Sequence, residues 1–301
     1  MMKKYNPLVS VVMPVYNSVG FLQNSVESIL TQDYPNFEFI IIDDCSTDNS
    51  LEVIKKYNDT RIKLIENPQN RGNYFCRNIG CRIAQGKYIA VMDCDDISMP
   101  NRLTKQVEVM EKSDDLLAVG SDHILLFPNG QEHNRKRIKE YKKIRLGLLK
   151  DNVALHPSLI IRKDIFKCIG FYNEEFYYSS DYDMLCRLSI RGKIIGIPEI
   201  LVKYRLHREQ ISFVANKLQG DYANIIRLRY LESCGFHLNK TDGEVYVKFM
   251  QSNIINQAET NSIERILNNL LEQNFITNFF DQDSLYSFFR HLTLNAIINA
   301  E

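Results

Sequence analysis

Three carboxylates stand together in the stretch Asp93-Cys94-Asp95-Asp96, directly after an apolar run at residues 88–92 that predicts a buried strand. Like charges this close repel one another, and burial raises the free-energy cost of ionising them. A bound cation removes that cost, and carboxylate oxygens suit Mg²⁺ or Mn²⁺. Asp93 and Asp95 could share such an ion, with positions left for phosphate. The alternative is a solvated acidic turn.

The elements that must position this cluster alternate between strand and helix. Strands are predicted at residues 9–13, 37–42, 61–65, 88–92 and 116–127, and helices at 21–32, 49–57, 74–85 and 100–112. Repeated βαβ order, with strands apolar on both faces, predicts a mostly parallel sheet covered by helices. Ligands bind such sheets outside the carboxyl ends of the strands.

Two further polar clusters fall at predicted strand ends, Pro14-Val15-Tyr16-Asn17 and Asp43-Asp44. The turn backbone and the Tyr16 ring could receive a flat base, and a carboxylate after the second strand could accept the imide N–H of uracil. Arg77, near the start of its helix, has a forked guanidinium suited to a diphosphate or a base. The alternatives are a strand-ending turn with a core tyrosine, a helix-capping aspartate and a surface arginine.

The alternation weakens after about residue 130. A strand is predicted at residues 156–161, a helix at 181–191, two short strands within 194–206 around Pro198, and helices from 216 to the end. Residues 135–145 hold seven lysines or arginines, with apolar residues at helical spacing. This run is either a solvated helix face or a contact with anionic lipid or a phosphate-bearing acceptor.

Composition excludes several classes of protein. The 301 residues carry 37 basic and 37 acidic side chains, so a general nucleic-acid binder is not expected. No apolar run approaches the length of a membrane-spanning helix, and the N-terminus resembles no signal-peptide core. Seven cysteines without CxxC or zinc spacing predict reduced thiols in a cytoplasmic protein. Because GxGxxG and GxxxxGK[ST] loops are absent from the sequence, a metal is expected to carry diphosphate charge.

The motifs taken in order resemble the nucleotide-sugar domain of family 2 glycosyltransferases. They lie at residues 10–17, 42–48, 70–80, 86–96 and 100–103, and the resemblance extends over about residues 8–212. It implies an α/β GT-A fold in residues 1–212, with a nucleotide-binding half at 1–127 and an acceptor half at 128–212. Residues 213–301 are expected to form a C-terminal helical appendage.

The resemblance also assigns roles on the donor side. Asp44 would bind the base, Asp95 the metal, and Asp93 the ribose or the metal. The expected nucleotide-binding set is completed by Pro14, Tyr16, Asn17 and Arg77.

On the acceptor side, residues 178–188 resemble a family motif that often carries Glu-Asp where this chain has Ser180-Asp181. Asp181 would be the general base, and a helix N-terminus would favour its ionised form. Residues 204–207 resemble the closing segment of the family, in which His207 would bind the metal or the diphosphate. His156-Pro157-Ser158 resembles the acceptor-side wall.

Together these features predict a Mn²⁺- or Mg²⁺-dependent inverting glycosyltransferase that moves a sugar from a UDP-sugar to an acceptor hydroxyl. The acceptor would be a saccharide or lipid-linked molecule of bacterial surface polysaccharide or glycoconjugate synthesis, reached at the inner face of the membrane through residues 135–145. One alternative is a Mg²⁺-dependent phosphatase or phosphotransferase, although the first predicted strand ends without a nucleophilic carboxylate. Another, prompted by Ser180, is a nucleotide-sugar-binding protein without turnover.

Overall fold

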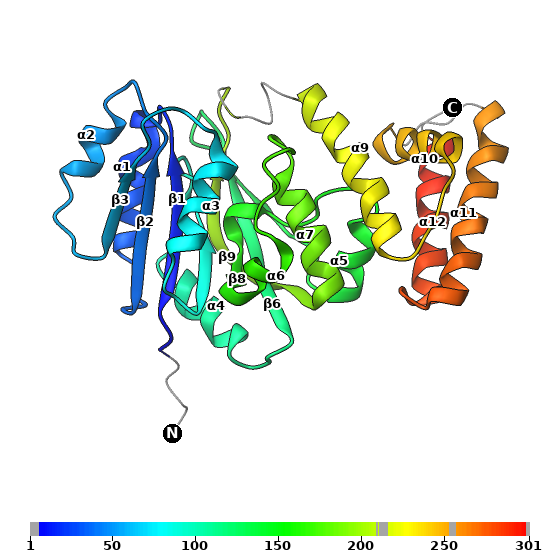
Figure 1. Ribbon diagram of the computed structural model, residues 1–301, viewed down its shortest axis with the longest axis horizontal. Helices are drawn as coiled ribbons and strands as arrows, with labels where there is room; N and C mark the ends of the chain where they lie inside the picture. The colour runs from blue at the N-terminus through cyan, green and yellow to red at the C-terminus, as the bar shows by residue number, and fades with distance from the viewer. Residues whose placement is uncertain (1–5, 209, 211–215, 253–256, 299–301) are drawn as a thin grey trace.

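The first four strands form one half of a nine-stranded sheet in the computed structural model, which describes residues 6–208, 210, 216–252 and 257–298. They are β1 (Val9–Val15), β2 (Phe37–Asp43), β3 (Ile62–Glu66) and β4 (Tyr88–Val91), and they lie in the order β3-β2-β1-β4. All three pairings are parallel, so the carboxyl ends of these strands share one edge, the upper one in Figure 1. The residues that follow those ends are therefore brought together.

The other half of the sheet is mixed. Strand β8 (Ile160–Arg162) pairs antiparallel with both β4 and β6 (Leu116–Leu126), and β6 pairs in parallel with β9 (Lys193–Arg205). The short strands β5 (Ile97–Ser98) and β7 (Glu132–Arg135), which the sequence pattern did not predict, pair antiparallel with β9 and β6. The predicted α/β fold with a largely parallel sheet is confirmed, and β8 from the acceptor half lies between two strands of the nucleotide-binding half.

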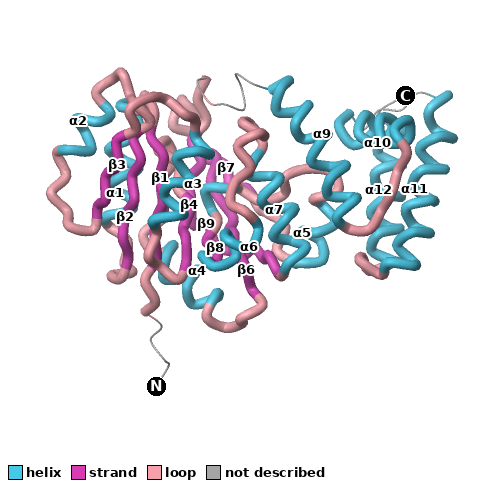
Figure 2. The backbone as a smooth tube through the Cα atoms, in the orientation of Figure 1, coloured by secondary structure: helices cyan, strands magenta, loops and turns pink. Residues whose placement is uncertain are grey.

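Helices cover both faces of the sheet (Figures 1 and 2). Helices α1 (Val19–Leu30), α2 (Ser50–Lys55) and α4 (Arg102–Met110) pack on one face, against alternate β1 residues such as Val11 and Met13. On the other face, Val12 belongs to the core formed with α3 (Asn73–Ile83), α5 (Tyr141–Gly147), α6 (Lys163–Ile169) and α7 (Ser180–Arg191). Both strand faces are buried, as their continuous apolar sequence predicts.

Two local predictions in the second half need correction. Residues 194–206 do not form two strands, because β9 continues past Pro198 with a register shift against β6, where Ser121 pairs with Ile197 and Asp122 with Ile200. Proline lacks the N–H that a regular ladder needs, so the chain forms a bulge and resumes pairing. The predicted strand at 156–161 begins instead as a 3₁₀ turn, His156–Ser158.

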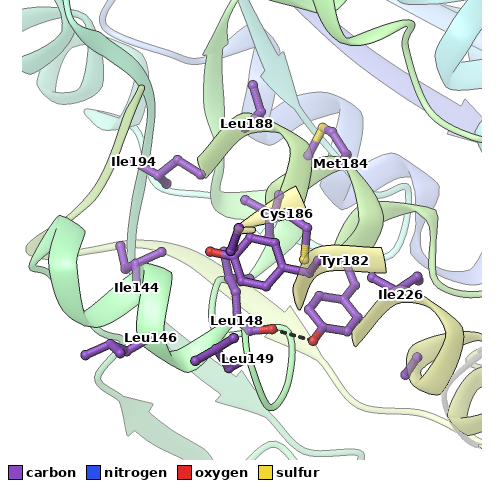
Figure 3. Close-up of a cluster of buried hydrophobic side chains, with 14 of the residues drawn as sticks. Ile144, Leu146, Leu148, Leu149, Tyr182, Met184, Cys186, Leu188, Ile194 and Ile226 are labelled. Atoms are coloured by element: carbon purple, nitrogen blue, oxygen red, sulfur yellow. Dashed lines mark hydrogen bonds between the residues drawn. The ribbon is translucent and has the colours of Figure 1, made fainter. Parts of the chain in front are cut away.

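The C-terminal residues form the predicted helices α9 (Asn216–Ser233), α10 (Lys240–Ser252), α11 (Gln257–Thr277) and α12 (Gln282–Ile298). They share a core with the sheet-covering helices: Ile226 of α9 packs in the cluster around α5 and α7 shown in Figure 3. In the same region the Tyr182 hydroxyl donates to the Leu148 carbonyl at 2.6 Å, and the Tyr246 hydroxyl to the Leu149 carbonyl at 3.0 Å. The predicted boundary at residues 212 and 213 lies outside the described residues.

The described helices include none with both the length and the apolar content that crossing a bilayer requires. The seven cysteines form no disulfide in the structure.

Candidate active site

A cleft of about 760 Å³ lies at the carboxyl edge of the sheet and takes its walls from both halves of the fold. All of the predicted site residues except Arg77 line it: Pro14, Tyr16, Asn17, Asp44, Asp93, Asp95, Asp181 and His207. The segments come from widely separated parts of the sequence, so their convergence is a property of the fold.

The acidic cluster lies on one wall. One carboxylate oxygen from each of Asp93, Asp95 and Asp96 lies within 4.8 Å of the others. Burial, with the charges of Asp95 and Asp93, raises the pKa of Asp96 well above its usual range, and one of its oxygens is buried without a hydrogen-bond partner. Burial and the neighbouring Asp95 and Asp181 raise the pKa of Asp93 to about 6, against the opposing effect of Arg77. This carboxylate set fits a hard divalent cation, which would relieve the repulsion.

His207 adds a nitrogen beside this cluster. Its Nε2 lies 2.9 Å from Asp95 Oδ2, and its ring lies 4.6 Å from the ring of Phe21. The backbone N–H of His207 donates to Gln210 Oε1 at 3.3 Å, which fixes the chain at this point. Imidazole and carboxylate together suit Mn²⁺ as well as Mg²⁺ with water.

Buried cations lie behind the cluster. The side chain of Arg77 is ion-paired with Asp93, and its Nη1 donates to the Met92 carbonyl at 3.3 Å. Arg77 is only 1% exposed, so its guanidinium positions Asp93 from beneath the cleft and does not face a ligand. Arg102, whose pKa burial lowers to about 10, donates to the Val91 carbonyl at 2.8 Å and is stabilised as a cation by the charge of Asp96.

The predicted nucleobase-binding wall is formed by the loops after β1 and β2. The Tyr16 ring is 46% exposed, whereas the Asp44 carboxylate accepts the backbone N–H of Gly72 at 2.7 Å and the Asn67 amide at 2.8 Å. Gly72 has φ +91 and lies against the Tyr177 ring, where a Cβ would come within 2.4 Å of a ring carbon. Asn17 Oδ1 accepts the backbone N–H of Thr47 at 2.7 Å, which joins the two loops.

Asp181 lies on the opposite wall, in the first turn of α7. Its Oδ1 accepts the Tyr74 hydroxyl at 3.0 Å and its Oδ2 accepts the Asn152 amide at 2.8 Å. Burial raises the pKa of Asp181, and hydrogen bonds from the Tyr182 backbone and the Tyr74 hydroxyl oppose that shift. A carboxylate with a raised pKa is a better proton acceptor than an exposed one. Ser180 is fully buried, so it does not replace the acidic side chain of the family motif in the cleft.

Sequence reasoning missed Tyr74 and Asn152, which hold the predicted base. Tyr74 precedes Arg77 by three positions and therefore shares its helix face, a spacing that points to the same sheet edge. Asn152 lies in the loop after α5, and no local pattern marks it. His156, of the predicted acceptor-side wall, lines the cleft, and its Nε2 lies 2.9 Å from the Tyr172 hydroxyl.

Comparison with known proteins decides the family. The model of the family described as Glycosyl transferase family 2 matches residues 10–170, more than half of the chain. The chain belongs to glycosyltransferase family 2. The predicted family and enzyme class are thereby confirmed.

Sequence similarity between this family 2 glycosyltransferase and its relatives extends beyond the segment that the family model matches. A glycosyltransferase of Haemophilus influenzae is 34% identical over 254 residues, which cover 80% of this chain and 77% of the relative. WfgD of Escherichia coli, named as a UDP-Glc:α-D-GlcNAc-diphosphoundecaprenol β-1,3-glucosyltransferase, is 30% identical over 207 residues, covering 68% of this chain and 79% of its own.

Solved structures share the fold of this glycosyltransferase. TarS residues 1–349 of S. aureus, in complex with UDP-GlcNAc, has a TM-score of 0.65 at 16% identity and covers 97% of this chain and 92% of its own. The mannosyltransferase PcManGT of Pyrobaculum calidifontis, in complex with GDP-Man and Mn²⁺, has a TM-score of 0.58 at 14% identity, covering 98% and 87%. The predicted GT-A fold is confirmed by this likeness.

Proposed function

We propose that this glycosyltransferase moves a sugar from a UDP-sugar to an acceptor hydroxyl with inversion, and that it requires Mn²⁺ or Mg²⁺. The observation that carries the proposal is one cleft with clustered carboxylates and His207 on one wall and Asp181 on the other. Support comes from TarS in complex with UDP-GlcNAc, from PcManGT with Mn²⁺, and from WfgD, whose name specifies UDP-Glc.

Asp95 and His207 would hold the cation together with Asp93. When bound, it would neutralise the carboxylates and stabilise the charge that develops on the departing diphosphate. Arg77 keeps Asp93 in place by its ion pair, and the Arg205 backbone N–H donates to Asp96 Oδ1 at 2.9 Å. These contacts fix the positions of the carboxylates before any ligand arrives.

The nucleotide would bind between the loops that follow β1 and β2. The exposed ring of Tyr16 offers a flat surface for a base, and the Pro14 and Asn17 positions complete that turn. Asp44 lines the same part of the cleft and would accept the imide N–H of uracil in addition to its loop contacts. This hydrogen-bond acceptor at Asp44 is the reason for preferring a uridine nucleotide.

Asp181 would act as the general base. It takes the proton of the acceptor hydroxyl while that oxygen forms a bond to the anomeric carbon. The bond from this carbon to the diphosphate oxygen breaks, and its electron pair leaves with UDP. A single displacement of this kind inverts the anomeric centre. Tyr74 and Asn152 orient the carboxylate for the transfer.

A lipid-linked saccharide of a bacterial surface polysaccharide pathway is the acceptor class that WfgD suggests by its name. The side chains of Arg135, Lys136, Lys142 and Lys143 are exposed in the basic stretch and would suit contact with anionic lipid at the inner face of the membrane.

Calorimetric titration of UDP tests the proposal. Binding should appear with MnCl₂, weaken at least tenfold in EDTA, and weaken as much in Asp95→Ala with MnCl₂ present. Asp114→Ala, which removes an exposed carboxylate elsewhere, is the matched control and should bind as the wild type does. Equal UDP affinity with and without Mn²⁺ would overturn metal dependence. Phosphate release from a simple phosphate ester would favour the phosphatase alternative.

A further inference from the structure

Arg137 is the only lysine or arginine among the described residues that line the cleft. It lies just before α5, within the basic stretch, and its side chain is half-buried. Its Nε is buried without a hydrogen-bond partner, and its guanidinium forms no ion pair with another described residue. By contrast, Arg77 is committed to Asp93, and Arg205 donates to the Asp95 carbonyl at 2.9 Å.

The backbone around Arg137 is held firmly. Its N–H donates to Asp122 Oδ1 at 2.7 Å, and the same carboxylate is ion-paired with Lys139. On the other side, the Gly196 N–H donates to the Lys139 carbonyl at 3.0 Å. The Asp122 carboxylate is therefore already ion-paired with Lys139, whereas the Arg137 guanidinium has no ion-pair partner among the described residues.

The negative groups near Arg137 offset its burial only in part. Burial lowers the pKa of Arg137, and Tyr204, Asp151 and Asp122 oppose that shift. His123 lies nearby in the core, and burial together with Arg137 lowers its pKa to about 4. A partly buried cation whose charge is only partly compensated favours an incoming anion.

Arg137 has neighbours toward both walls of the cleft: it interacts electrostatically with Tyr204, three residues before His207. It also interacts electrostatically with Asp151, and the next residue, Asn152, donates to the Asp181 carboxylate. The donor diphosphate is assigned above to the metal cluster around Asp95, so its binding does not require Arg137. An anion that reaches Arg137 would thus belong to the molecule whose hydroxyl meets Asp181.

We propose that Arg137 binds a phosphate group of the acceptor, so that the acceptor is a saccharide linked to phosphate or diphosphate. The forked guanidinium could take two phosphate oxygens at once, which would set the distance between the phosphate and the reacting hydroxyl. This inference rests on the proposed transfer function and adds to it the chemical class of the acceptor and the residue that selects it.

Binding of octyl diphosphate to the full chain, with MnCl₂ and saturating UDP, tests the inference. We expect saturable binding that weakens about tenfold to a hundredfold in Arg137→Gln, since a charge-assisted hydrogen bond is lost. Arg137→Lys keeps the charge without the fork and should fall between the two. Arg290→Gln makes the same charge change at an exposed position of α12 outside the cleft lining and should bind as the wild type does.

Three outcomes would overturn the inference. The first two are the absence of saturable octyl diphosphate binding to the wild type and equal weakening in the Arg290 and Arg137 variants. The third is a loss of Mn²⁺-dependent UDP affinity in Arg137→Gln as large as the loss for octyl diphosphate, which would assign Arg137 to the donor. If the wild type fails to bind UDP, the proposed donor is wrong; octyl diphosphate binding that still depends on Arg137 without UDP would support the anion site independently.

Discussion

The two walls of the cleft hold their carboxylates by opposite means. On the wall proposed to bind the donor, which carries Asp93, Asp95 and Asp96, Asp93 is ion-paired with the buried Arg77 and Asp96 interacts electrostatically with the buried Arg102. On the acceptor wall, Asp181 is held by two neutral donors, the Tyr74 hydroxyl and the Asn152 amide. Buried charges support the first set of carboxylates directly, whereas Asp181 is oriented by hydrogen bonds, with a further electrostatic contribution from Arg77.

The difference follows from what each wall must do. Three carboxylates in contact need fixed positive charge beneath them, since they would otherwise take up protons or move apart. A base must instead change its protonation state within a reaction cycle, and neutral partners orient it without committing it to the ionised form. Substitutions that remove a charge should therefore affect the donor wall most. Substitutions that remove an orienting hydrogen bond should affect the acceptor wall most.

The largest effect is expected for Asp181→Asn. Loss of the proposed general base should lower the rate of UDP release from the UDP-sugar substrate, with water or an added acceptor, by about 10²–10⁴-fold. Mn²⁺-dependent UDP affinity should stay within about twofold of the wild type, because the donor wall is intact. Retained turnover would show that another group accepts the proton. If UDP affinity fell by as large a factor as turnover, the assignment of donor binding and proton transfer to different walls would be wrong.

Arg77→Met should destabilise the metal-free protein by about 3–5 kcal/mol at neutral pH, because it leaves Asp93 without its buried counter-charge. Urea unfolding in EDTA measures the change. The double variant Arg77→Met/Asp93→Asn should recover most of the loss, since the unpaired charge is then gone. If the double variant were as unstable as the single one, the packing of the Arg77 side chain, and not its charge, would be what stabilises the fold.

The two walls also differ in how far the sequence predicts them. Asp44, Asp93 and Asp95 were placed correctly at the sheet edge because each directly follows a recognisable parallel strand. The partners of Asp181 lie 107 and 29 residues away from it in the chain, and such contacts depend on helix packing and loop paths. Arg137 was recognised only as part of a basic stretch, because the sequence of such a stretch does not show which guanidinium faces a cleft.

The burial of Arg77 shows a similar limit. Its helix position was predicted, but its burial depends on how α3 packs against β1 and β2. A guanidinium that suits a diphosphate suits an aspartate equally well, so residue type alone did not distinguish a ligand contact from an ion pair.

Tyr74→Phe should have a smaller effect, on the acceptor wall alone. It removes the 3.0 Å hydrogen bond to Asp181 and should cost about 1 kcal/mol, or a few-fold in turnover. Because that bond lowers the pKa of Asp181, its loss should move the acid limb of the pH–rate profile to higher pH. Tyr172→Phe removes a neighbouring hydroxyl that is hydrogen-bonded to His156, so the acid limb of the pH–rate profile of that variant should not move. Equal shifts in both variants would contradict the assigned role of Tyr74.

The smallest effect concerns pH and the donor wall. The folded-state pKa of Asp93, about 6, lies above the usual value of 3.8, so its contribution to stability is full below about pH 4 and is lost as the pH rises through 6. In EDTA this should lower the Tm by roughly 2 °C between pH 5 and pH 7.5, relative to Asp93→Asn. Mn²⁺ binds the ionised carboxylate, so it should raise the Tm of the wild type more at pH 7.5 than at pH 5. Asp181→Asn removes one of the charges that raise the pKa of Asp93, so it should reduce that difference without abolishing it. An equal gain from Mn²⁺ at both pH values would contradict a raised pKa at the donor wall.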